Sequence, residues 1–360
     1  MTANCDGVLP NQISDRADLI AYLQCAVELE HATLPLYLCA LYSLDPGRNP
    51  VAAEVLTTVF VEEMLHLTLA ANLLNAVGGA PELDHPRLLP GFPRALPHGD
   101  ETFEASLLPF GPEALAQLAR LERPAEPGSP AQAEGYSTIG QFYTAIRLGL
   151  CDLEADIGES ALFCGDPARQ VTDSFSYGGS GRIICVDDHA SAQAALREIV
   201  EQGEGGSAAV WDGDRDMFHP ERDEVGHFYR IEELCRGRRF RRGNTPGSGP
   251  TGDAIAIDWD GVRPSDRNRR RRGHADTRTA QRAFDVTYCD LLAILADTFN
   301  GRPERLDVAV GTMYQLKSSA QALMEIPSMN GWSATMPTFE YVSPADRFGS
   351  GARAGHALRR

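Results

Sequence analysis

Lysine is almost missing from this sequence of 360 residues: Lys317 is the single example, and arginine carries the rest of the positive side-chain charge. Lysine and arginine together number 33 against 50 aspartates and glutamates, which gives a formal net charge of −17. An acidic excess of this size disfavours nucleic acid and anionic membrane surfaces as partners. The arginine run at 267–272 is therefore interpreted as a solvated loop.

Long apolar runs and targeting signals are missing as well. No stretch of about 18 apolar residues occurs, and the N-terminal segment has neither the basic region nor the apolar core of a signal peptide. The eight cysteines are scattered without a CxxC pair, which favours reduced thiols over disulfides or a zinc site. These absences predict a cytoplasmic protein. The length predicts a single elaborated domain over residues 1–342, and we expect the tail at 343–360 to be mobile.

Helical periodicity dominates what is present. Apolar residues recur every three or four positions in segments at about 16–43, 51–77, 111–121, 138–163, 190–204, 221–236, 278–299 and 304–326. The first two segments predict an antiparallel hairpin, and the proline- and glycine-rich stretch at 80–136 predicts a long crossover. A short strand is expected at 182–186. The pattern predicts an all-α fold, a four-helix bundle with additional helices and long irregular crossover loops.

Acidic side chains fall in the middle of apolar helix faces. On a helical wheel Glu30 lies at the centre of an apolar stripe, and Glu63 occupies the same kind of position with His66 one turn further along. Glu224 and His227 repeat the Glu-x-x-His spacing in the segment at 221–236. An ionised carboxylate is costly to bury unless it is paired or bound to a cation, so these positions predict a metal site.

Four helices that offer Glu, Glu-x-x-His, Glu and Glu-x-x-His form the ligand set of di-iron and di-manganese carboxylate proteins. The remaining single glutamate is expected in the segment at 190–204, where Glu204 lies nearer the apolar face than Glu201. The predicted ligands are Glu30, Glu63, His66, Glu204, Glu224 and His227. Such ligands suit two iron ions, with manganese as the alternative. Tyr37 and Tyr229 lie close to ligand positions in the sequence and are the candidate catalytic side chains.

Several sequence blocks resemble a known family. They are LEHATLPLYLCALYS, VEEMLHLTLAANLLNAVGG, STIGQFYTAI, IVEQGEG, FYRIEEL, AIDWDGV and FNGRPERLDVAVGTMYQLKSSAQALM. Together they span about 16–342 and look like the ferritin-like domain of the iminophenylpyruvate dimer synthase family, although Gln141 stands where that family has an acid. The resemblance implies a ferritin-like bundle. It also implies an enzyme of violacein- or rebeccamycin-type biosynthesis that couples imines derived from an aromatic amino acid.

Residues and resemblance together predict a non-haem di-iron oxidase or oxygenase of natural-product metabolism. It would use O2 as co-substrate on a small amine, imine or aromatic amino-acid-derived molecule. Three alternatives stay open: a ferroxidase or peroxide-scavenging bundle, a metal-free scaffold, and a haem protein. A small-molecule substrate is the expected partner, and a homodimer is one option for the assembly.

Overall fold

The computed structural model describes residues 13–174, 180–206, 209–264, 275–327 and 334–348. Its helices are α1 (Arg16–Tyr42), α2 (Pro50–Ala76), α3 (Pro112–Leu121), α4 (Ile139–Ile157), α5 (Glu159–Leu162), α6 (His189–Glu204), α7 (His227–Arg236), α8 (Ala275–Phe299), α9 (Leu306–Met324) and α10 (Pro344–Phe348). Short 3-10 helices are η1 (Pro86–Leu88), η2 (Pro167–Arg169), η3 (Trp259–Gly261) and η4 (Pro303–Arg305). Strands β1 (Arg94–Ala95) and β2 (Glu104–Ala105) form one antiparallel pair, and β3 (Trp211–Arg215) and β4 (Asp223–Val225) form another. The predicted all-α class is confirmed.

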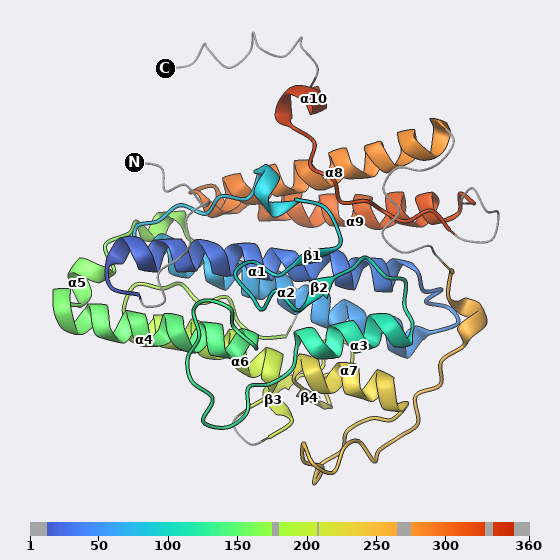
Figure 1. Cartoon of the computed structure of the whole chain (residues 1–360), viewed down its shortest axis with the longest axis horizontal. Coiled ribbons are helices and arrows are strands. Elements are labelled where there is room, and N and C mark those ends of the chain that lie inside the picture. Colours follow the sequence, from blue (N-terminus) through green and yellow to red (C-terminus); the bar gives the residue numbers. More distant parts are fainter. Residues whose placement is uncertain (1–12, 175–179, 207–208, 265–274, 328–333, 349–360) are drawn as a thin grey trace.

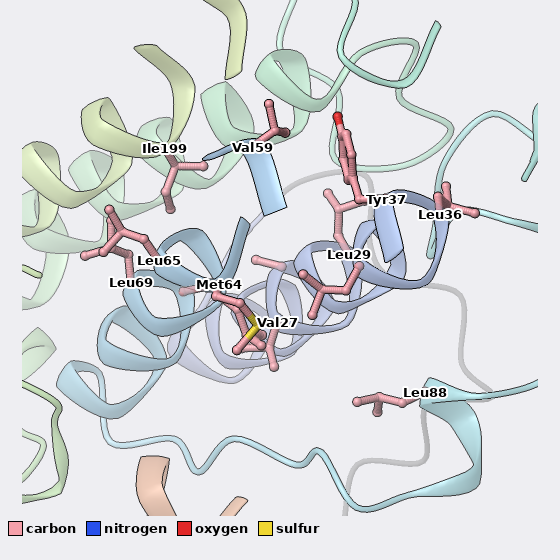
Figure 2. Packing of buried hydrophobic residues seen from close by; sticks show 14 of the residues in the cluster. Val27, Leu29, Leu36, Tyr37, Val59, Met64, Leu65, Leu69, Leu88 and Ile199 are labelled. Atoms are coloured by element: carbon pink, nitrogen blue, oxygen red, sulfur yellow. The ribbon is translucent and has the colours of Figure 1, made fainter. Parts of the chain in front are cut away.

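The helices form three layers (Figure 1). α1 and α2 lie side by side in the middle, the α8–α9 pair covers one side, and α3, α4, α6 and α7 cover the other. Because both sides are covered, α1 and α2 are buried almost all round and are not amphipathic surface helices. Figure 2 shows this packing, with Leu65 and Leu69 of α2 facing Ile199 of α6.

The third and fourth positions of the bundle are each built from two helices. α3 and α4 both pack against α1, whereas α6 and α7 both pack against α2. In Figure 1, α3 continues the line of α4, and α7 continues the line of α6. α6 ends at Glu204, and a Cβ added at Gly226 would lie 2.5 Å from the backbone nitrogen of the next residue, Gly205. The chain therefore leaves the bundle after α6 and returns to it at the same point.

Side-chain caps explain where several helices begin. The Thr138 hydroxyl accepts a hydrogen bond from the Gln141 backbone N–H and starts α4. Asp188 and Ser191 form a capping box at the start of α6. A glycine follows the C-terminal end of α2: Gly78 has a positive φ of 82°, a conformation that glycine adopts without strain.

The expected helix at 221–236 is wrong in its first half. Residues 223–225 form β4, which pairs with β3, and α7 begins only at His227. Glu224 and His227 are therefore not one helical turn apart on a common face, although three positions separate them in the sequence. Between β4 and α7 the backbone at Gly226 passes very close to Gly205. Only a residue without a Cβ fits there, so glycine permits the change from strand to helix.

Two further expectations also need correction. The helix expected at 138–163 is interrupted at Gly158, whose φ of 84° separates α4 from α5. The strand expected at 182–186 is not formed. Its backbone is bonded by side chains instead of a neighbouring strand: Asn72 donates to the Ile184 carbonyl, and Gln170 bonds both backbone groups of Val186.

Three other expectations concern termini, thiols and membranes. The arginine run at 267–272 and residues 349–360 of the tail lie outside the described residues, whereas 344–348 form α10. The described cysteines are free thiols, as expected, although Cys164 and Cys235 are exposed. Within the described ranges, no helix combines the length and the hydropathy that crossing a membrane requires.

Candidate metal centre

Buried acids and imidazoles converge where the α3–α4 pair and the α6–α7 pair meet α1 and α2. Glu30 comes from α1, Glu63 and His66 from α2, Glu122 directly follows α3, and His227 is the first residue of α7. Each of these five side chains is at most 5% exposed. A long continuous helix pair thus supplies one half of the cluster, and two helix ends supply the other half.

The ring nitrogens that face the carboxylates are the Nδ1 atoms. His66 Nδ1 lies 3.7 Å from Glu30 Oε2 and 3.7 Å from Glu63 Oε1. His227 Nδ1 lies 2.8 Å from Glu63 Oε1 and 3.6 Å from Glu122 Oε2. The two imidazoles stack with ring centroids 5.2 Å apart. Glu63 therefore lies between the two histidines, where it could bridge two ions.

The opposite ring nitrogens are held by neighbouring side chains. His66 Nε2 lies 2.9 Å from Gln202 Oε1, and the Gln202 amide donates to Asp214 Oδ2 at 2.7 Å. His227 Nε2 lies 2.9 Å from Glu62 Oε2. A proton on each Nε2 satisfies these contacts and leaves the Nδ1 lone pair free for a metal. The acceptors thus select the tautomer that a metal site requires.

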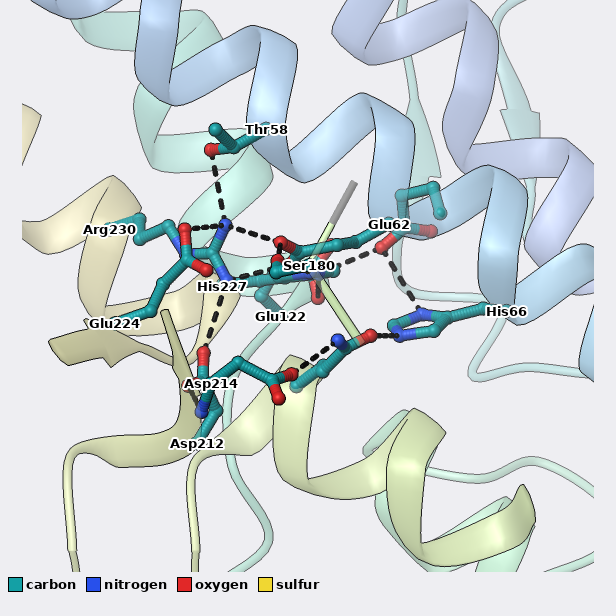
Figure 3. Close-up of polar contacts among 12 residues, drawn as sticks. Thr58, Glu62, His66, Glu122, Ser180, Asp212, Asp214, Glu224, His227 and Arg230 are labelled. Carbon is teal, nitrogen blue, oxygen red and sulfur yellow. Dashed lines mark hydrogen bonds and ion pairs between the residues drawn. The ribbon is translucent and has the colours of Figure 1, made fainter. Parts of the chain in front are cut away.

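Glu62 belongs to a buried network around Arg230 (Figure 3). The Arg230 guanidinium contacts Glu62 at 2.6 Å, Asp212 at 3.1 Å and Glu224 at 3.0 Å. Burial alone would raise the pKa of Glu62, but Arg230 and His227 together lower it to about 2. Glu62 is therefore ionised at neutral pH, and its carboxylate contacts Nε2 of His227.

Hydroxyl groups bond each of the three cluster carboxylates. Tyr37 donates to Glu122 Oε1 at 2.6 Å, Thr33 donates to Glu63 Oε2 at 2.6 Å, and Tyr143 donates to Glu30. Burial and the neighbouring carboxylates raise the pKa of both tyrosines well above the usual value. The phenols therefore stay protonated and act as hydrogen-bond donors to the acids.

The electrostatics of the cluster favour the binding of a cation. Among the described residues, no lysine or arginine contacts Glu30, Glu63 or Glu122. Burial, with Glu63 close by, raises the pKa of Glu30 well above its ordinary range. Although burial opposes the charged imidazole, three neighbouring carboxylates raise the pKa of His227 well above its usual value. Metal ions would supply the positive charge that this group of acids lacks.

His227 Nδ1 shows whether these residues fit a metal ion. His227 Nδ1 is buried and makes no hydrogen bond of acceptable geometry, even though Glu63 Oε1 lies 2.8 Å away. The raised pKa of His227 places a proton on this nitrogen in the metal-free protein, and a metal ion would take the place of that proton. Ligand atoms of Glu63, His66 and His227 all lie within 4.8 Å of one another, so both histidines and Glu63 can belong to one metal centre. The donor set of carboxylates and imidazoles suits iron or manganese.

The structure does not bring three of the predicted site residues to this cluster. Glu204 accepts from the Gly140 N–H at 2.9 Å and from the Ala125 N–H at 3.2 Å, so its carboxylate links the end of α6 to the chain around α4. Glu224 lies in β4 and pairs with Arg230. Tyr229 packs in a separate small apolar cluster with Val210, Val225 and Phe240. Glu30, Glu63, His66, His227 and Tyr37 do come together.

Glu122 is the acid that sequence reasoning missed. It follows Leu115 and Leu118 at helical spacing, so it lies on the buried stripe of α3. A helical wheel of this short helix marks Glu122 in the same way that longer wheels mark Glu30 and Glu63. Glu62, next to Glu63 in the sequence, is a further buried acid, but it is ion-paired with Arg230.

Comparisons with known proteins find relatives of this chain. The 2-imino-3-(indol-3-yl)propanoate dimerase of Chromobacterium violaceum is 28% identical over 254 residues, covering 62% of this chain and 24% of the relative. The dichlorochromopyrrolate synthase of Lentzea aerocolonigenes is 25% identical over 396 aligned positions, covering 91% of this chain and 36% of the relative. The chain thus spans about a quarter to a third of the length of these relatives. Both are natural-product enzymes, so the resemblance drawn from the sequence blocks is confirmed.

A solved structure and a family model agree on the fold. The crystal structure of a ferritin-like protein from Caulobacter vibrioides superposes with a TM-score of 0.62 at 22% identity, covering 91% of this chain and 99% of the other. The family model described as Ferritin-like matches residues 23–236, which include all five residues of the buried cluster. This chain belongs to the Ferritin-like family.

Proposed function

We propose that this chain is a non-haem dinuclear iron enzyme of natural-product metabolism, with manganese as the alternative metal. Glu30, Glu63 and His66 would hold one ion, and Glu63, Glu122 and His227 would hold the other. The convergence of both histidine Nδ1 atoms on buried carboxylates without basic partners carries the proposal. The kinship with enzymes that act on imines derived from aromatic amino acids supports a small substrate of that kind.

The bound iron ions would supply the electrons for O2 reduction, and O2 would be the final oxidant of the substrate. The side chains of this chain would hold the ions and control protons. Gln202 and Glu62 fix the histidine tautomers, and Arg230 keeps Glu62 anionic. Tyr37 holds Glu122, and Tyr143 holds Glu30, in place as ligands through the hydrogen bonds that the phenols donate. Of the two tyrosines proposed from the sequence, Tyr37 is the one that reaches the proposed centre.

Metal content is the first test. Protein reconstituted with Fe(II) under anaerobic conditions is expected to bind about two ions per chain. Subsequent exposure to O2 should change its near-ultraviolet and visible absorption. Glu63→Gln removes the shared carboxylate, so this variant should bind much less iron. A wild-type protein that binds less than one ion per chain would contradict the proposal.

A ferroxidase is the competing function, and the substrate dependence of O2 consumption separates the two. An enzyme that oxidises an organic molecule should consume O2 faster when an aromatic amino-acid-derived imine is present. A ferroxidase should consume O2 with Fe(II) alone and show no response to the imine. Oxygen-electrode measurements with and without the imine distinguish the two functions.

A further inference from the structure

A cavity of about 470 Å³ lies between α4 and α6. Its volume falls within the range of about 300–1,000 Å³ that small-molecule sites occupy. Tyr143 of α4 lines it, together with Leu196 and Val200 of α6. Tyr143 is 1% exposed, and its hydroxyl donates to Glu30 of the buried cluster. The cavity therefore reaches within one side chain of a proposed metal ligand.

Two contacts establish how α4 and α6 face each other. Near one end of the helix pair, Gly140 donates to Glu204, and near the other end the Gln193 amide contacts Cys151 Sγ at 3.8 Å. These contacts define an antiparallel register. In this register Arg147 faces Arg197, and Tyr143 faces Glu201, and all four side chains line the cavity.

The two facing arginines are an unusual pair in such an acidic chain. Neither Arg147 nor Arg197 forms an ion pair with any residue in the part of the chain that the structure describes. Both side chains are exposed, so solvent weakens their mutual repulsion, and a bound anion would give both of them a partner. Arginine is also well suited to bind a carboxylate through two parallel N–H donors.

The charge in the cavity is graded along its length. Along the axis of α6, Arg147 and Arg197 lie at about the same height. Glu201 and Glu204 lie about one and two helical turns closer to the buried cluster. Val200 lies between the arginines and these acids, and Leu196 lies beside Arg197. A molecule with one carboxylate and an apolar or aromatic body thus finds complementary surface in one orientation, with its carboxylate on the arginines.

We infer that this cavity is the substrate site and that Arg147 and Arg197 bind the carboxylate of an aromatic carboxylic acid. The aromatic body would then point along α4 towards Tyr143 and Glu30. The inference rests on the proposed function for the role of the bound molecule as substrate. The binding site itself does not depend on metal, because none of the five proposed ligands lines the cavity.

The test measures binding of indole-3-propionate to the full chain by isothermal titration calorimetry, with and without Fe(II) under anaerobic conditions. Arg147→Gln and Arg197→Gln should each weaken binding about tenfold, because each loses a charge-assisted contact. Indole-3-propanamide, which lacks the charge, should bind weakly to wild type and variants alike. Arg282→Gln in α8 is the matched control and should bind the acid as wild type does.

Two results would overturn the inference. One is unchanged affinity for indole-3-propionate in the Arg147→Gln/Arg197→Gln double variant. The other is an affinity that falls only when Arg241 and Arg242, which line a different cavity of about 620 Å³, are changed. Elemental analysis of the same samples keeps the two proposals apart. Normal metal content with unchanged binding refutes the substrate site alone, and absent metal with arginine-dependent binding refutes the metal centre alone.

Discussion

At the scale of single residues, three carboxylates decide whether the buried cluster can hold metal. Glu30, Glu63 and Glu122 have hydroxyl donors and histidines as neighbours but no basic side chain within the described ranges. Glu204 is different, because both of its oxygens accept hydrogen bonds from backbone N–H groups. The contacts of an acid, and not its place in a motif, therefore separate ligand candidates from structural acids.

This distinction predicts opposite outcomes for two matched substitutions. Glu122→Gln should lose about one of the two proposed ions, because an amide is a much poorer ligand than a carboxylate. Glu204→Gln should keep its metal, since the amide oxygen can still accept one of the two backbone hydrogen bonds. Elemental analysis after reconstitution compares the two. Loss of metal in Glu204→Gln with full retention in Glu122→Gln would reverse the assignment.

A second prediction at this scale concerns His31, which is fully buried on α1 and contacts the Tyr288 hydroxyl at 3.1 Å. Burial, helped by Arg94, lowers the pKa of His31 to about 3. Between about pH 6.5 and pH 3, His31 therefore binds a proton in the unfolded chain but not in the folded chain. The stabilising contribution is complete above about pH 6.5 and is lost as the pH falls below that value.

His31→Gln should remove this contribution to the pH dependence. Between pH 6 and pH 4 the free energy of unfolding of wild type should fall more steeply, by up to about 1.4 kcal/mol per pH unit, than that of the variant. Urea unfolding at several pH values measures both slopes. Parallel curves for the two proteins would show that His31 is protonated in the folded state.

At the scale of elements, the junction between the broken helices is the most constrained part of the bundle. A Cβ added at Gly140 in α4 would lie 2.1 Å from a Glu204 carboxylate oxygen. Glu204 is held there by the N–H groups of Ala125 and Gly140 itself. The end of α6 and the start of α4 are thus joined through the Glu204 carboxylate.

Gly140→Ala should therefore destabilise the protein by about 1–3 kcal/mol, because the added methyl group would displace the Glu204 carboxylate from its two backbone donors. Gly311→Ala is the matched control: Gly311 lies within α9, and a Cβ there meets nothing within 4 Å. That change should stabilise the protein by about 0.5–1 kcal/mol through helix propensity. Thermal unfolding of both variants checks the two signs. A neutral or stabilising Gly140→Ala would show that Glu204 is not tightly held.

At the scale of the whole molecule, the three helix layers enclose a group of acids that is short of positive charge. The formal net charge of −17 includes Glu30, Glu63 and Glu122, which are buried in the bundle and add nothing to its solvated surface. Metal bound by these acids in the folded state has no equivalent site in the unfolded chain. Binding should therefore appear directly as stability.

Saturating Fe(II) under anaerobic conditions, or Mn(II), should raise the unfolding midpoint. At a free metal concentration of about 100 times the Kd, the gain is about 2.7 kcal/mol. A chelator should return the midpoint to its starting value. Glu63→Gln, which loses the shared ligand, should show little response to metal. Equal shifts in wild type and Glu63→Gln would mean that the metal binds elsewhere.

Local sequence was sufficient for one half of the candidate site. Glu30, Glu63 and His66 lie on uninterrupted helices of 27 residues, so a single period of 3.6 residues relates each polar side chain to its apolar neighbours. The ends of these helices follow from local signals as well, such as the glycines after α2. The all-α class and the family resemblance rest on the same local patterns.

Tertiary structure decided the other half. Glu122 and His227 reach the cluster from helix ends, and the segments between α3 and α4 and between α6 and α7 break any continuous period. The Glu224–His227 spacing suggested one helical turn, but pairing of β4 with β3 turned Glu224 towards Arg230. A sequence period can relate residues only along one unbroken element. Contacts between separate elements depend on how the chain packs as a whole, and only the folded molecule sets them.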